Sequence, residues 1–128
     1  MKYKIVDIPP KMERYYGVGK MLHPHREMII ELLEAIPPGQ IMTMDQFCQQ
    51  LADQAGTEAA CPMRTSHQLK KMAEAVELAV EEQQIPFWRV VRKNRSLLNI
   101  SNKVFAAAKL EDEGIKLRYG PKGDIFCE

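Results

Sequence analysis

Apolar residues between positions 24 and 36 recur three and four residues apart, which is the spacing of an amphipathic helix. The pattern predicts a helix over residues 24–35 whose buried stripe consists of Met28, Ile29, Leu32 and Leu33. The following Ile-Pro-Pro-Gly, residues 36–39, would end this helix, because proline disfavours helical backbone in the residue before it.

A second helix is predicted to begin at Thr43, after a short extended piece over residues 40–42. Thr43 and Gln46 have the spacing of a capping box, in which each side chain satisfies a free backbone N–H. The apolar stripe that follows consists of Met44, Phe47, Cys48 and Leu51. Cys48 is therefore interpreted as a small buried hydrophobic residue, not as a reactive thiol.

A third helix is predicted from Pro62 to about residue 82, because proline is favoured in the first turn of a helix. Leu69, Met72, Val76, Ala79 and Val80 cluster on one side of it. Arg64, His67, Gln68 and Lys71 cluster on another side and would face solvent. Two helices joined by a turn in this way predict a helix-turn-helix, with residues 62–72 as its recognition element.

The remaining segments predict a small β component. Residues 2–8 alternate as a weak strand, and residues 85–93 are interpreted as a buried extended segment. A further helix over 103–113 would end at Gly114, and residues 115–119 and 124–127 form a plausible terminal hairpin. The predicted fold is mainly α: a winged-helix-like helix-turn-helix domain over 22–128, preceded by an N-terminal extension over 1–21.

Composition indicates an ordinary soluble globule, since 45% of the 128 residues are apolar and 27% are charged. No apolar run is long enough for a membrane span, and the N-terminus has no secretory signal pattern. Three cysteines argue against a disulfide scaffold and favour a cytoplasmic location. His23 and His25 lack a partner pair of metal ligands, so we expect neither a metal site nor a cofactor.

The net charge of +1 conceals a basic segment. Residues 83–110 contain no acidic residue but carry Arg89, Arg92, Lys93, Arg95, Lys103 and Lys109. An acidic block precedes this segment and consists of Glu74, Glu77, Glu81 and Glu82. A basic segment is typical of a phosphate-binding surface, although a solvated charged face would look the same in the sequence.

Four stretches together resemble a known family: residues 39–52, the helix with Arg64, residues 85–91 and residues 110–114. They resemble the C-terminal domain of methylated-DNA–protein-cysteine methyltransferases, and resemble the alkyltransferase-like proteins still more. The resemblance covers about residues 22–118. Its most specific part is the block Ile-Pro-x-x-Arg-Val-Val at 85–91.

In the repair enzymes the corresponding block reads Pro-Cys-His-Arg, and a glutamate completes the relay that activates the cysteine. Here Phe87 occupies the cysteine position and Trp88 the histidine position, while Arg89 and Glu113 match the arginine and the glutamate. A phenyl ring cannot accept an alkyl group by displacement, so alkyl transfer is expected to be lost. Alkyltransferase-like proteins carry tryptophan instead of the cysteine and bind alkylated DNA without repairing it.

The resemblance implies a role for each matching residue. Arg64 would be the finger that fills the space of a flipped nucleotide, and Phe87, Trp88 and Glu113 would line the pocket for the alkylated base. His67, Gln68 and Lys71 would contact the groove or backbone, and Arg89, Arg92, Lys93 and Arg95 would hold phosphates. The implied partners are double-stranded DNA with alkylated guanine and nucleotide-excision repair proteins. The alternatives are that Phe87 and Trp88 are core residues and that Arg64 is merely solvated.

The sequence departs from the family at three places. Met44 replaces a tyrosine that rotates the phosphate, the hinge asparagine after the recognition helix is missing, and residues 99–102 replace the Tyr-Ser-Gly-Gly pocket loop. Three other hypotheses therefore stay open. They are a winged-helix regulator without lesion recognition, a protein-interaction module that uses the acidic block, and an alkyltransferase that uses Cys61. Cys61 precedes a helix N-terminus, which would lower the pKa of its thiol, or it is simply the structural residue before that helix.

Overall fold

A computed structural model of the chain describes residues 3–77, 85–98, 100 and 103–128. Its helices are α1 (Glu13–Tyr16), α2 (Arg26–Ala35), α3 (Met44–Ala55), α4 (Pro62–Glu77) and α5 (Lys103–Asp112). Two 3-10 turns, η1 (Pro10–Met12) and η2 (Phe87–Arg89), accompany them. The strands are β1 (Lys4–Asp7), β2 (Lys20–His23), β3 (Met42–Thr43), β4 (Ala59–Ala60), β5 (Val90–Val91), β6 (Leu117–Tyr119) and β7 (Ile125–Cys127). The predicted class, mainly α with a small β component, is confirmed.

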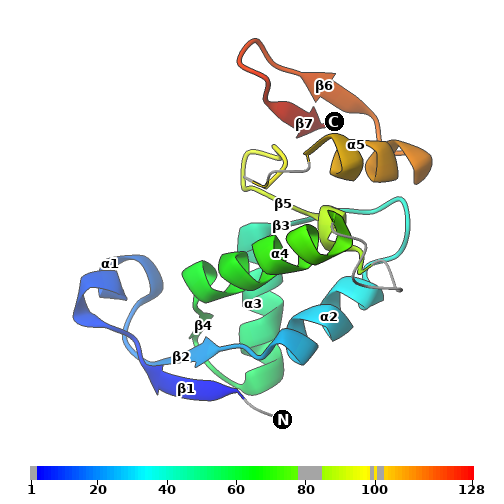
Figure 1. Ribbon diagram of the computed structural model, residues 1–128. Helices are drawn as coiled ribbons and strands as arrows, with labels where there is room; N and C mark the ends of the chain where they lie inside the picture. The colour runs from blue at the N-terminus through cyan, green and yellow to red at the C-terminus, as the bar shows by residue number, and fades with distance from the viewer. Residues whose placement is uncertain (1–2, 78–84, 99, 101–102) are drawn as a thin grey trace.

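Helices α2, α3 and α4 pack around one apolar core, with α4 crossing the middle of the molecule (Figure 1). Four residues of α2 are buried, and they are the predicted Met28, Ile29, Leu32 and Leu33. On α3 the buried residues are Phe47, Cys48, Leu51 and Ala52, while the predicted Met44 is only half-buried. The helical periodicity therefore located the core correctly on both helices.

Both ends of α3 are set by local chemistry. Thr43 and Gln46 form the predicted capping box, and the Gln46 side-chain oxygen accepts a hydrogen bond from the Thr43 N–H at 3.1 Å. Gly56 ends the helix in the left-handed conformation, with φ of 72°, which costs glycine little. The connection to α4 is more than a turn, because it contains strand β4.

Strand β4 belongs to a three-stranded sheet that the sequence pattern did not predict. Strand β1 pairs antiparallel with β2, and β2 pairs parallel with β4 through Met21–Ala59 and Leu22–Ala60. The predicted strand within residues 2–8 is thus observed as β1. The pairing places the N-terminal hairpin beside the start of α4 (Figure 1).

Residues 85–93 do not form the predicted continuous extended segment. The Phe87 N–H donates to the Ile85 carbonyl at 2.8 Å and the Arg89 N–H to that of Pro86 at 3.3 Å, which closes the turn η2. Only β5 is extended, and it pairs parallel with β3. The predicted burial is confirmed, since residues 85–88 and 90–91 are all buried.

Helix α5 and the hairpin β6–β7 form the end of the molecule opposite to β1 (Figure 1). Gly114 follows α5 with a φ of 89°, as the predicted helix stop requires. The predicted extension of α4 to residue 82, with Ala79, Val80, Glu81 and Glu82, lies outside the described residues. Within the described part of the chain, no helix is both long and apolar enough to cross a membrane.

Replacing Thr43 with alanine should lower the free energy of unfolding by about 1 kcal/mol, because the N-cap partner of the first turn of α3 is lost. Urea denaturation followed by circular dichroism measures the change. Gln50→Ala on the exposed face of the same helix is the matched control and should change stability far less. Equal stability of the two variants would contradict the capping role of Thr43.

Candidate nucleic-acid interface

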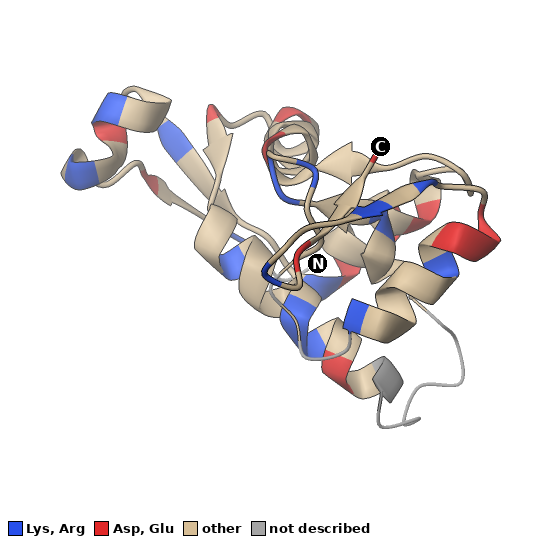
Figure 2. Ribbon diagram, turned by 90° about the horizontal axis from the view of Figure 1, so that it is seen from above, with Lys and Arg blue, Asp and Glu red and all other residues tan. Residues whose placement is uncertain are grey.

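The first turns of α4 present a basic surface to solvent. Arg64, His67 and Lys71 are exposed and Gln68 is half-buried, whereas Leu69 and Met72 on the opposite side are buried. The predicted split between a core face and a solvent face is therefore observed. Figure 2 shows Lys and Arg positions along α4, while acidic residues lie towards its end, next to the grey trace.

Lys70 and Met63 extend this surface, although sequence reasoning did not include them. Lys70 is exposed one residue before the predicted Lys71. Met63 is 75% exposed, which is unusual for a large apolar side chain, and it directly precedes Arg64. We define Met63, Arg64, His67, Gln68, Lys70 and Lys71 as the α4 surface.

Two hollows flank the α4 surface. The larger, of about 950 Å³, lies between the start of α4 and the segment that joins β2 to α2. The smaller, of about 440 Å³, lies between α4 and the first residue of α3, Met44. Met63 and His67 line both hollows, so their side chains form a ridge between them.

The predicted phosphate-binding residues of the segment 89–95 divide into two groups. Arg92 and Lys93 are exposed, and Lys93 shares a cavity of about 330 Å³ with Met44 and Pro62, close to the start of α4. Arg95 instead turns to the C-terminus, where its guanidinium donates to the carbonyls of Cys127 at 3.2 Å and Glu128 at 2.9 Å. Arg95 thus holds the last strand, whereas Lys93 lines a hollow together with the first residue of α4, Pro62.

The side chain of Arg89 is engaged in interactions within the fold, contrary to the prediction that it binds a phosphate. Its side chain is 12% exposed and forms an ion pair with Glu113, with Nη2 2.8 Å from Oε2. Its Nε donates to the same carboxylate at 3.0 Å, and Nη1 donates to the Ile36 carbonyl at 2.8 Å. A guanidinium that is satisfied in this way does not present its donors to a surface ligand.

Glu113 is the acceptor on which these donors converge. The indole Nε1 of Trp88 donates to Oε2 at 3.0 Å, and the Gly39 N–H approaches Oε1 at 3.4 Å. Burial alone would raise the pKa of Glu113. The hydrogen bonds from Arg89 and Trp88 and the charge of Arg89 outweigh it and lower the pKa below its usual value of 4.5.

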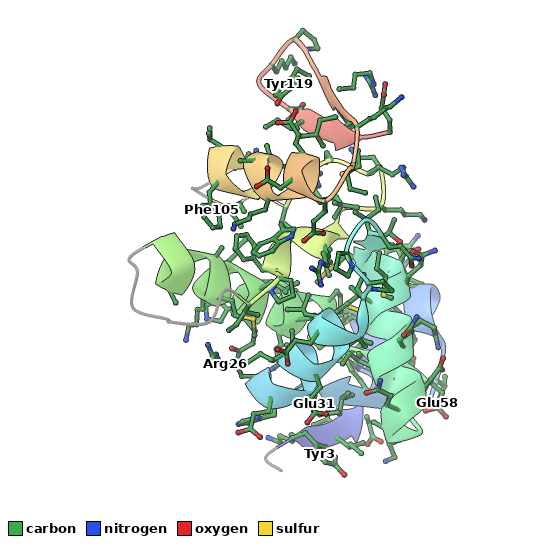
Figure 3. The ribbon with its side chains drawn as sticks, turned by 90° about the vertical axis from the view of Figure 1, so that its right-hand side faces the viewer. Tyr3, Arg26, Glu31, Glu58, Phe105 and Tyr119 are labelled. Atoms are coloured by element: carbon green, nitrogen blue, oxygen red, sulfur yellow. The ribbon has the colours of Figure 1, made fainter. Side chains whose placement is uncertain are left out.

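Phe87 and Trp88 pack as core residues. Phe87 is completely buried and Trp88 is 6% exposed. Their rings meet edge to face with centroids 5.4 Å apart. Phe105 of α5, which Figure 3 labels, stacks on Phe87 with centroids 6.3 Å apart. This arrangement matches the alternative that both are core residues. Residues 99, 101 and 102 of the predicted pocket loop lie outside the described residues, so a base pocket here stays a prediction.

The three cysteines are buried, and Cys61 also lines the larger hollow beside Arg64. Cys48, Cys61 and Cys127 are all buried and free, and burial raises the pKa of the Cys48 thiol to about 11. The backbone of Cys61 joins two elements, since its N–H donates to the Leu22 carbonyl at 2.8 Å and its carbonyl accepts from the Thr65 hydroxyl at 2.8 Å. This matches the interpretation of Cys61 as a structural residue before α4.

No described group of three or more histidine, cysteine or acidic side chains is placed to hold a metal ion. The structure instead assembles a basic site that the sequence did not reveal. Tyr3, Lys4 and His23 line the larger hollow opposite Arg64 and His67. No sequence signal could have joined them, because the parallel pairing of β2 with β4 brings them together across more than 30 residues.

Comparison with known proteins gives a fold assignment. No family model matches the chain, and no curated protein matches its sequence. Among solved structures, S. pombe Atl1 in complex with damaged DNA containing O6-carboxymethylguanine aligns with a TM-score of 0.58 at 14% identity. S. pombe ATL in complex with DNA aligns with a TM-score of 0.54 at 16% identity. Each alignment covers 80% of this chain and 87% of the other. The chain therefore has the fold of the alkyltransferase-like proteins.

Replacing Glu113 with glutamine should lower the free energy of unfolding by about 3 kcal/mol, because Arg89 then stays in the interior without its counter-charge. The loss should be largest above pH 4.5. It should shrink as the pH falls through the lowered pKa of Glu113, where the wild type also loses the charge.

Chemical denaturation of both proteins between pH 3 and pH 7 measures this difference. Glu111→Gln, at an exposed position in the last turn of α5, is the matched control and should cost much less. A Glu113→Gln penalty that does not change with pH would contradict the ion-pair account.

Proposed function

We propose that the chain binds double-stranded DNA through the α4 surface and recognises an alkylated guanine in it without transferring the alkyl group. One observation carries the proposal: the start of α4 is exposed and basic, and two solved structures with the same fold are in complex with DNA. In those examples the DNA is described as damaged in one case and simply as DNA in the other.

The charge of α4 favours contact with DNA. Its residues 62–73 contain Arg64, Lys70 and Lys71 and no acidic residue, so a phosphate backbone meets no repulsion there. Lys93 adds positive charge beside the start of the helix. Such contacts release counterions from the DNA. This release becomes less favourable in free energy as the salt concentration rises, so the affinity for DNA falls.

Arg64 is the residue best placed to replace an extruded base. It is the third residue of α4 and is exposed, so its guanidinium can enter the duplex while the helix lies in a groove. We propose that the extruded base is received at the Phe87–Trp88 end of the fold, where aromatic side chains could stack on it. Full burial of Phe87 means that this end must open first.

The proposed loss of alkyl transfer rests on the side-chain chemistry of Phe87 and Trp88. Phe87 has no nucleophilic atom, and the indole of Trp88 has an N–H donor but no acceptor nitrogen. Trp88 therefore keeps the hydrogen bond to Glu113 at 3.0 Å but cannot remove a proton from a nucleophile. A protein that binds a lesion without removing it needs a second system to excise it, and we propose nucleotide-excision repair proteins as that partner.

Full burial of Phe87 also favours a second candidate, a DNA-binding regulator that has no lesion recognition. The two candidates differ in one ratio, the affinity for a duplex with O6-carboxymethylguanine relative to the same unmodified duplex. A ratio well above one supports lesion recognition, and a ratio of one supports the regulator.

Replacing Arg64 with alanine should reduce this ratio about tenfold, because the guanidinium no longer compensates for the extruded base. Fluorescence anisotropy with the two duplexes, at two salt concentrations, measures it. Lys122→Ala, an exposed change of the same charge in the β6–β7 connection, is the control and should leave the ratio unchanged. A ratio that Arg64→Ala leaves intact would rule out the finger role.

Incubation with the alkylated duplex should leave the mass of the protein unchanged, since no thiol occupies the acceptor position. Intact-protein mass spectrometry detects the alkyl group if it is transferred. A stoichiometric mass increase would overturn the proposal, and the Cys61→Ser variant would then identify or exclude Cys61 as the acceptor.

A further inference from the structure

The larger hollow beside α4 has two walls of different origin. One wall is the start of α4, with Arg64 and His67, and the other is the N-terminal hairpin, with Lys4 on β1 and His23 at the end of β2. Tyr3, which is 48% exposed, lies at its N-terminal side (Figure 3 labels it). We call this hollow, of about 950 Å³, the hairpin groove.

The hairpin groove is lined by basic groups. Lys4 and Arg64 are cationic, and His23, His25 and His67 are the only three histidines of the chain. Of the described residues that line the groove, none is acidic. Asp7 on the same strand as Lys4 is bound to the ammonium of Lys20, so its charge is already compensated. Lys4 on one wall and Arg64 on the other therefore give the groove a positive charge that favours an anionic ligand.

His23 contributes a second, independent indication of a ligand. Its Nδ1 is buried and has no hydrogen-bond partner among the described residues. Burial first, and then the charges of Arg64 and Lys4, lower the pKa of His23, so both cations act on the imidazole. A buried polar atom without a partner costs free energy, and a ligand in the groove could supply the missing partner.

We propose that the hairpin groove holds the sugar–phosphate backbone of one DNA strand, so that the N-terminal hairpin completes the DNA-binding surface that α4 begins. The inference rests on the proposed function, because it assumes that α4 approaches a duplex. Lys4 donates to phosphate oxygens from one wall, and His23 donates through its unpartnered Nδ1 once a small shift of the hairpin uncovers that buried atom. Phosphate contacts of this kind position the duplex and do not read its sequence.

Lys4→Ala should raise the Kd for an unmodified duplex several-fold and reduce the slope of log K against log salt concentration by about one. Lys11→Ala is the matched control, since Lys11 is an exposed lysine of the same N-terminal segment but does not line the groove. Fluorescence anisotropy of the full chain at four salt concentrations gives both quantities. Equal slopes for Lys4→Ala and Lys11→Ala overturn the inference.

His23→Phe tests the groove in a second way, because phenylalanine keeps the ring but has no polar atom. We expect the melting temperature of the free protein to stay the same or rise, since an unpartnered buried nitrogen is removed. We expect the affinity for DNA to fall at least threefold. A lower melting temperature with unchanged affinity would show that His23 serves only the fold, and would overturn its role in binding.

The outcomes separate this inference from the proposed function. A wild-type chain that binds no DNA overturns both. If the wild type binds DNA and Arg64→Ala weakens this binding, but Lys4→Ala and His23→Phe do not, the proposed function is retained and the role of the hairpin groove is overturned.

Discussion

The ion pair between Arg89 and Glu113 joins segments that are distant in the sequence. Arg89 also binds the carbonyl of Ile36 after α2, and Glu113 receives the indole N–H of Trp88. The end of α2, the turn η2 and the end of α5 are thereby held together at one carboxylate. Strand β5 follows η2 directly and pairs with β3, which leads into α3. The position of α3, and with it α4, therefore depends on this pair.

The residues around η2 therefore have a structural role in this fold. The ion pair between Arg89 and Glu113 stabilises the fold around η2, and this role does not require a cysteine. Trp88 donates its indole N–H to the same carboxylate, and Phe87 packs on Phe105 in the core.

The sequence predicted those features that depend on residues close together in the chain. The buried stripes of α2 and α3, the capping box at Thr43 and the stop at Gly114 follow from helical periodicity and backbone preferences. The solvent-facing side of α4 was predictable for the same reason.

Features that depend on distant contacts were predicted wrongly or not at all. Arg89 looked like a surface cation because its partner Glu113 lies 24 residues further on. The parallel pairing of β2 and β4 involves two residues on each strand, too few for a periodic signal. The hairpin groove follows from that pairing, so Lys4 and His23 could not be assigned to the same surface as Arg64.

The central claim is that DNA contacts the α4 surface, and amide chemical shifts can locate the contact directly. The measurement is a ¹⁵N–¹H spectrum of the full chain, titrated with a short duplex that contains one O6-carboxymethylguanine. The account predicts that the largest shift changes fall on residues 62–71 and on the adjoining groove around Lys4 and His23. Shift changes confined to α5 and the β6–β7 hairpin, or no changes at all, would contradict it.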